Sequence, residues 1–152
     1  MYKMINKKLF DGLLRDITSL GGFFFFFMLL VIVLALQETQ LFYQLLLGMV
    51  LTFLAIVIIR TFYYKDRPNK EKHRTYVERI DASSFPSLHT ARTIFLALVF
   101  IYYFNNNLLT AVLIILALSV AYSRLYLKKH DTWDLFGGFI LGLIVFWISS
   151  LI

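Results

Sequence analysis

Five long stretches of the chain consist mainly of apolar residues, and shorter polar segments separate them. The stretches cover roughly residues 18–36, 41–62, 86–104, 108–127 and 133–152. A helix needs about 20 apolar residues to cross the hydrocarbon core of a bilayer, so each stretch is long enough to span a membrane. The pattern predicts an all-α bundle of five transmembrane helices.

The N-terminal segment and one long loop break this pattern. In residues 2–17, apolar side chains such as Ile5, Leu9 and Leu13 recur at helical spacing with charged side chains between them. This is typical of an amphipathic helix in the membrane interface, although a solvated tail would also be polar. We therefore divide the chain into an interfacial helix (1–17) and a transmembrane bundle (18–152), with a polar loop at 63–85.

Composition supports an integral membrane protein. Of the 152 residues, 60% are hydrophobic and 16% charged, and the mean hydropathy is +0.75, whereas soluble domains are only about half apolar. We expect no separate soluble domain. The chain has no cysteine, which excludes disulfides, thiolate metal sites and cysteine nucleophiles.

The net charge of +6 indicates how the bundle is oriented. Counting crossings from the N-terminus puts all 15 lysines and arginines on or beside one face, and the opposite turns, 37–40 and 105–107, contain none. The positive-inside rule then predicts that this face is cytoplasmic. A phosphate site would gather arginines on its own face whichever way that face pointed. The predicted orientation therefore depends mainly on the lysines. We expect the basic residues to meet anionic lipids, and not nucleic acid.

Three polar segments converge on that face, and the first contains Arg60 and the pair Arg67-Pro68. Seven residues are about two helical turns, so both guanidinium groups would emerge on one side if the second span continued through them. Two arginines stacked in this way suit an oxyanion. The alternative is that they only extend to lipid headgroups.

The second segment is Pro86-Ser87-Leu88-His89. Proline is tolerated in a first helical turn, where free N–H groups, a hydroxyl and the helix dipole attract an anion. His89 could give a proton to a leaving oxygen, although a lone histidine at this boundary would more often bond a neighbouring carbonyl. Arg92 follows one turn later and would reach either the site or a headgroup.

The third segment contains Ser123-Arg124, His130 and Asp134. A helix that begins there would stack His130 and Asp134 on one face, because they are four residues apart. A carboxylate on one imidazole nitrogen leaves the other nitrogen nucleophilic. We expect Asp131 to be a helix-start charge.

A metal site is the alternative use of these histidines and carboxylates, which are common metal ligands. Three nearby arginines would repel a dication, whereas they would neutralise a phosphoryl group. We therefore favour phosphoryl transfer without a metal or another cofactor.

In order, the three segments resemble the signature of the type-2 phosphatidic acid phosphatase superfamily: lysine, six residues, Arg-Pro; then Pro-Ser-Gly-His; then Ser-Arg, five residues, histidine, three residues, aspartate. The third motif matches completely, and the motifs cover residues 60–134. Arg60 replaces the usual lysine, which changes reach and geometry, and Leu88 replaces the usual glycine. Membrane members commonly have six helices, so the amphipathic segment would replace the first.

The resemblance implies a role for each matching residue. His130 would attack phosphorus to form a phosphohistidine with support from Asp134, and His89 would protonate the leaving group. The phosphoryl oxygens would be held by Arg60, Arg67, Ser87, Arg124 and N–H groups near Leu88. No metal is implied.

The substrate expected at a membrane face is a phosphorylated lipid, either a phosphomonoester or a diphosphate. Polyprenyl phosphates, phosphatidic acid and phosphatidylglycerophosphate all present the same group. Two other functions stay open: transfer of a phosphoryl or headgroup to an alcohol, and lipid binding by an inactive bundle in which Leu88 marks lost catalysis.

Gly138 and Gly142 form a GxxxG pattern in the last span. Such a pattern is compatible with a homodimer face, but close packing inside the bundle is the interpretation that we prefer.

Overall fold

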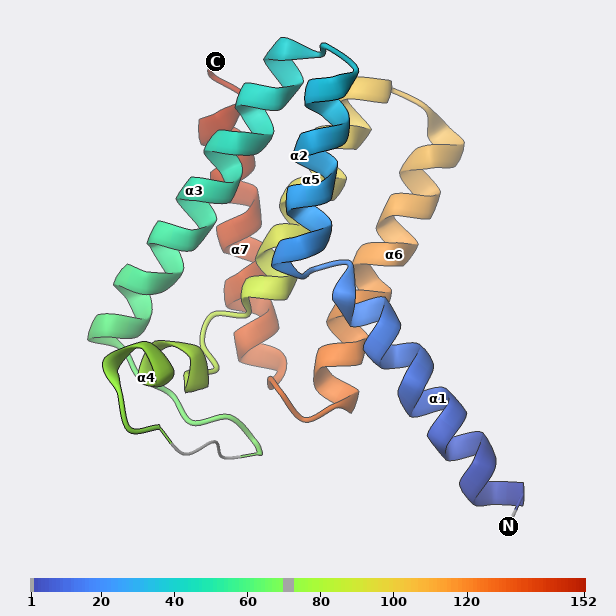
Figure 1. Ribbon diagram of the computed structural model, residues 1–152, viewed down its shortest axis with the longest axis vertical. Helices are drawn as coiled ribbons and strands as arrows, with labels where there is room; N and C mark the ends of the chain where they lie inside the picture. Colours follow the sequence, from blue (N-terminus) through green and yellow to red (C-terminus); the bar gives the residue numbers. More distant parts are fainter. Residues whose placement is uncertain (1, 70–72) are drawn as a thin grey trace.

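The computed structural model describes residues 2–69 and 73–152, with side chains from residue 7 onward. In these ranges the chain is helical and contains no strand (Figure 1), which confirms the all-α prediction. The helices are α1 (Tyr2–Ser19), α2 (Phe23–Ala35), α3 (Thr39–Phe62), α4 (Tyr76–Ala82), α5 (Leu88–Phe104), α6 (Asn107–Tyr126) and α7 (Thr132–Ser149).

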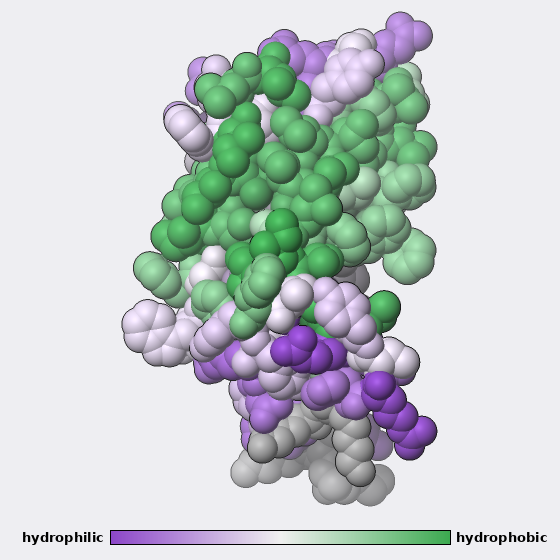
Figure 2. Space-filling model, turned by 90° about the vertical axis from the view of Figure 1, so that its left-hand side faces the viewer, coloured by the Kyte–Doolittle hydropathy of each residue, from purple (hydrophilic) through white to green (hydrophobic). Residues whose placement is uncertain are grey.

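The helices confirm part of the predicted membrane topology. Among the described residues, three helices are long and apolar enough to cross a bilayer, namely α3, α6 and α7. The first predicted span is broken, because a turn at 20–22 bends the chain by 47° between α1 and α2. The α5 helix is apolar but has only 17 residues. The count of five full spans is therefore not confirmed, although Figure 2 shows an apolar band between polar ends.

The α1 helix is docked onto the end of α6. The Tyr126 hydroxyl donates a hydrogen bond to Asp11 at 2.9 Å, the Phe10 and Tyr126 rings meet edge to face, and Leu14 is buried. Leu9 and Leu13 stay exposed. An amphipathic helix with an uncovered apolar edge suits a membrane interface, and the interfacial location stays a prediction.

The α5 helix lies at the centre of the bundle, where α2, α3, α6 and α7 pack around it (Figure 1). Phe95 of α5 stacks on Phe26 of α2, with ring centroids 5.9 Å apart, and both side chains are fully buried. Gly48 of α3 makes room for the Phe95 ring, because a Cβ at residue 48 would lie only 2.0 Å from it. This packing fixes the helix whose first turn carries the predicted site.

Gly138 and Gly142 of α7 pack against α5. A Cβ at Gly138 would lie 2.5 Å from the Ser87 carbonyl oxygen, and one at Gly142 would lie 2.8 Å from that of Ala91. Close packing inside the bundle, the preferred interpretation of this pattern, is thus what the structure shows.

The polar loops meet at one end of the bundle, the lower end in Figure 1. There α3 ends, α5 and α7 begin, and α6 turns into α7. The predicted loop 63–85 also contains the short helix α4. A capping box starts it, because Thr75 accepts from the Glu78 N–H while the Glu78 carboxylate accepts from the Thr75 N–H. The Thr-x-x-Glu spacing was the signal that could have predicted this helix.

Candidate active site

The turn after α6 folds His130 back onto Arg124. Lys128 adopts a left-handed conformation with φ of 54°, and the N–H groups of Lys129 and His130 both bond the Arg124 carbonyl, at 3.1 and 3.3 Å. Arg124 Nη2 and His130 Nε2 are consequently 3.3 Å apart. Arg124 and His130 are therefore six residues apart because the turn that ends α6 needs that many residues to bring the two side chains together.

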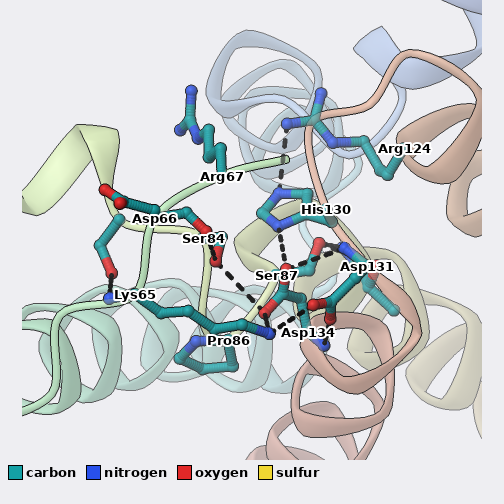
Figure 3. Close-up of polar contacts among 12 residues, drawn as sticks. Lys65, Asp66, Arg67, Ser84, Pro86, Ser87, Arg124, His130, Asp131 and Asp134 are labelled. Atoms are coloured by element: carbon teal, nitrogen blue, oxygen red, sulfur yellow. Dashed lines mark hydrogen bonds and ion pairs between the residues drawn. The ribbon is translucent and has the colours of Figure 1, made fainter. Parts of the chain in front are cut away.

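The start of α7 supplies the partner of His130. Asp131 is the N-cap, and its carboxylate accepts from the Asp134 N–H at 3.0 Å while Asp134 Oδ2 accepts from the Asp131 N–H at 2.9 Å. Asp134 Oδ2 also faces His130 Nδ1 at 3.6 Å, longer than a hydrogen bond (Figure 3). The predicted shared helix is wrong, because α7 begins at Thr132. A capping box turns the carboxylate back toward the imidazole instead.

The neighbours of His130 set its tautomer. A guanidinium can only donate, so Nε2 beside Arg124 must carry the lone pair and Nδ1, which faces Asp134, the proton. His130 is only 3% exposed. Burial lowers its pKa, Arg124 lowers it further, and Asp134 opposes both. These effects favour a neutral imidazole whose Nε2 lone pair points toward Arg124.

Lys65 completes this cluster, and sequence analysis did not identify it. Lys65 Nζ lies 2.6 Å from Asp131 Oδ2 and 2.8 Å from Asp134 Oδ1, and the Ser84 hydroxyl lies 3.4 Å from the same Asp134 oxygen (Figure 3). Partial burial lowers the pKa of Lys65, but the hydrogen bonds to both carboxylates outweigh it and the net pKa is raised. No spacing rule indicates Lys65, because it comes from an extended loop far away in sequence.

The two arginines of the first segment reach the site by a route that was not predicted. The α3 helix ends at Phe62, so Arg60 and Arg67 do not share a helix. Arg60 is buried and donates to the carbonyls of Ile80 and Pro86, each at 2.9 Å, while Arg67 donates to the Asp81 carbonyl. Arg60 therefore holds the segment before α5 in place.

The second segment forms the start of α5, two residues later than predicted. Leu88 is the first helical residue and Ser87 the N-cap, so Pro86 lies before the helix and follows a cis peptide bond. The Ser87 N–H bonds the Asp134 carbonyl at 2.9 Å, and Ser87 Oγ accepts from the Thr90 N–H and hydroxyl. The N–H groups of Leu88 and His89 lie in the first turn of α5, where an α-helix provides them with no carbonyl partner.

The leucine that replaces the usual glycine is accommodated without strain. Leu88 lies in the first turn of α5, and the described non-glycine residues with positive φ are Gln37, Asn105 and Lys128. The backbone at Leu88 therefore needs no conformation reserved for glycine, and its N–H group keeps the helix-start position.

His89 faces the same region as His130. Four neighbouring groups are close enough for their charge to act on it, namely Arg124, Arg92, His130 and Arg67. The turn between α1 and α2 closes one side: Gly21 packs on His89, and Arg124 Nη1 lies 3.4 Å from Thr18 Oγ1. In the described part of the chain, no three or more His, Asp or Glu side chains group closely enough to hold a metal ion. Two histidines thus face one region bordered by cations.

Comparisons with known proteins identify the family and the fold of the chain. The family model described as the PAP2 superfamily matches residues 41–152. No curated protein sequence matches the chain. The crystal structure of Aquifex aeolicus LpxE is similar over 95% of this chain and 87% of its own, with 25% identity and a TM-score of 0.78. A transmembrane PAP2 type phosphatidylglycerolphosphate phosphatase from Bacillus subtilis is similar over 93% of this chain and 75% of its own, with 23% identity and a TM-score of 0.70.

Proposed function

The chain belongs to the PAP2 superfamily, and we propose that it is an integral membrane phosphatase that hydrolyses a phosphomonoester or diphosphate of a lipid through a phosphohistidine. The observation that carries the proposal is the state of His130. Its Nε2 lone pair lies beside Arg124, and its Nδ1 proton faces the buried carboxylate of Asp134. This is the arrangement of an activated nitrogen nucleophile next to an oxyanion-binding cation.

In the first step, His130 Nε2 attacks phosphorus and the bond to the leaving oxygen breaks. The negative charge of the bound phosphate stabilises the imidazolium form of His89, which donates its proton to that oxygen. Arg124, Arg67, Ser87 and the N–H groups at the start of α5 hold the other phosphoryl oxygens, which gain charge in the transition state. Arg60, whose terminal nitrogens bond carbonyls, supports this cradle by fixing the loop before α5.

In the second step, water attacks the phosphohistidine. His89, now neutral, takes a proton from the water, and the phosphorus–nitrogen bond breaks to release phosphate. His130 and His89 return to their starting states, so the cycle balances with the chain's own groups and water. It needs no metal ion.

Asp134 and Lys65 act through His130. While His130 carries the phosphoryl group its ring is positively charged, and the adjacent carboxylate stabilises that charge. Lys65 pairs with the other oxygen of Asp134, which keeps this buried carboxylate ionised and oriented. Lys65 is a positioning residue in this scheme.

A lipid substrate is supported by the location of the site. The site lies at one end of an apolar bundle (Figures 1 and 2), where a headgroup would meet it while the tail stays among the helices. The Bacillus subtilis relative is itself named for a phospholipid substrate. Polyprenyl phosphates, phosphatidic acid and phosphatidylglycerophosphate are the classes to compare.

The test is phosphate release by the detergent-purified protein from a panel of these lipids, with a chelator present. His130→Ala should lower release by at least about a thousandfold, because the nucleophile is removed. His73→Ala is the matched control, because His73 is an exposed loop histidine, and it should keep full activity. Undiminished release by His130→Ala would overturn the proposal, and an alcohol adduct formed in place of phosphate would favour the transferase alternative.

A further inference from the structure

Arg92 of α5 is a buried cation without a partner of opposite charge. Arg92 is only 5% exposed. It makes no hydrogen bond or ion pair with any residue that the structure describes. Its Nε is buried without a partner. The contact that the structure does provide is with the ring of Phe23, whose centroid lies 5.9 Å from Arg92 Cζ.

An unpaired guanidinium is costly inside an apolar bundle, and such groups are normally matched by an anion. The surroundings increase the cost. Phe23 begins α2, whose positive dipole end is capped by Gly22, a residue without a side-chain acceptor. Two positive groups therefore meet at a place where the described chain offers no carboxylate, which favours an anion supplied by a ligand.

Arg92 lies one helical turn from His89 on α5. Arg92 follows His89 by three residues, so both side chains are on one face of α5, and helical side chains lean toward the N-terminus of their helix. This directs Arg92 back toward His89, close enough for its charge to act on the imidazole. Gly21, which precedes α2, packs directly on His89.

We propose that Arg92 binds a second phosphate, which the leaving group carries, so that the preferred substrate is a lipid diphosphate. This inference rests on the proposed function. His130 would attack the terminal phosphorus, and His89 would protonate the bridging oxygen as its bond to that phosphorus breaks. The leaving group is then a lipid monophosphate, whose remaining phosphate stays paired with Arg92.

An apolar cavity lies farther along the same helix. Thr93, the next residue, lines this cavity of about 190 Å³ together with Leu96 and Phe100 of α5, Leu29 of α2 and Leu113 of α6. Terminal phosphate, second phosphate and hydrocarbon chain would therefore follow one another along α5, from His130 through His89 and Arg92 to this cavity. A monophosphate would leave Arg92 unpaired.

The first test uses the unaltered protein with farnesyl diphosphate and farnesyl monophosphate, which share one hydrocarbon chain. Initial rates are measured by separating farnesyl monophosphate from farnesol. The inference predicts a kcat/KM at least about tenfold higher for the diphosphate. An equal or lower value would overturn the inference while leaving the proposed function intact, whereas hydrolysis of both lipids by His130→Ala would overturn the function itself.

The second test changes Arg92. In Arg92→Gln and Arg92→Met the diphosphate-to-monophosphate ratio of kcat/KM should fall at least about tenfold, mainly through KM, and Arg92→Lys should restore most of it. Arg74→Gln removes one charge from an exposed loop position and should keep the ratio. A parallel loss on both substrates would assign Arg92 a structural role and overturn the inference.

Discussion

At the scale of single residues, the site depends on one carboxylate that serves two partners. Asp134 faces His130 with Oδ2 and Lys65 with Oδ1, and it is fully buried. Its His130 partner was predicted because both residues lie in one short segment of sequence. Lys65 was not predicted, since 69 positions separate it from Asp134 and only the folded loop brings them together.

Removing the positive charge at residue 65 should weaken catalysis without removing the nucleophile. We expect Lys65→Met to lower kcat about ten- to a hundredfold, with a smaller change in KM. Activity falls by a similar factor in metalloenzymes when a residue that orients a histidine ligand is removed. Lys65→Arg should recover much of the loss, which a merely structural role would not require. Steady-state kinetics on one lipid substrate measure this, and an unchanged kcat in Lys65→Met would contradict the positioning role.

The buried setting of His130 predicts the acidic side of the pH–rate profile. Burial penalises the imidazolium and lowers the pKa of His130 below the ordinary histidine value of about 6.5. The neutral nucleophile therefore persists as the pH falls through 6.5, and kcat/KM of the free enzyme should decline only at lower pH. A profile of kcat/KM from pH 4 to 8 measures this limb. A midpoint above 6.5 would contradict the assignment.

At the scale of helices, close backbone contact between α5 and α7 joins the parts of the site. Gly138 packs on the Ser87 carbonyl, and the Ser87 N–H bonds the Asp134 carbonyl. The helices themselves could be predicted from apolar stretches, and the central part of each predicted stretch is helical in the structure. Their ends could not, because capping at Ser87 and Asp131 and the early end of α3 depend on local hydrogen bonds that hydropathy does not report.

Adding one methyl group at Gly138 should separate α5 from α7. The new Cβ would lie 2.5 Å from a backbone oxygen, so we expect Gly138→Ala to lower the free energy of unfolding by about 1–3 kcal/mol and to reduce activity. Thermal unfolding in detergent measures the first effect. Gly12→Ala is the control, because nothing lies within 4 Å of that Cβ, and equal stability losses in the two variants would contradict this account.

At the scale of the whole molecule, the site and the polar loops share one end of the bundle (Figure 1). This arrangement was predictable, because the order of apolar stretches fixes which loops lie together. The full number of crossings was not, since the glycine pair after α1 breaks the first stretch and α5 is short. Which end faces the cytoplasm follows from the positive-inside rule and stays a prediction.

The chain has no cysteine, so single cysteines can report its orientation. In intact cells, an impermeant thiol reagent should fail to label Arg74→Cys at the site end and should label Gln40→Cys at the other end. Permeabilised cells provide the control, in which both should react. The reverse pattern would place the active site outside the cytoplasm.

The most direct measurement is detection of the phosphoryl group on His130. The enzyme is mixed with a hydrolysable lipid phosphate, quenched in alkali, digested and examined by mass spectrometry. We expect an added phosphate on the peptide that contains His130, stable in alkali, lost in acid and missing from His130→Ala. Rapid turnover with phosphate on another residue, or with full activity retained in His130→Ala, would contradict the proposed mechanism.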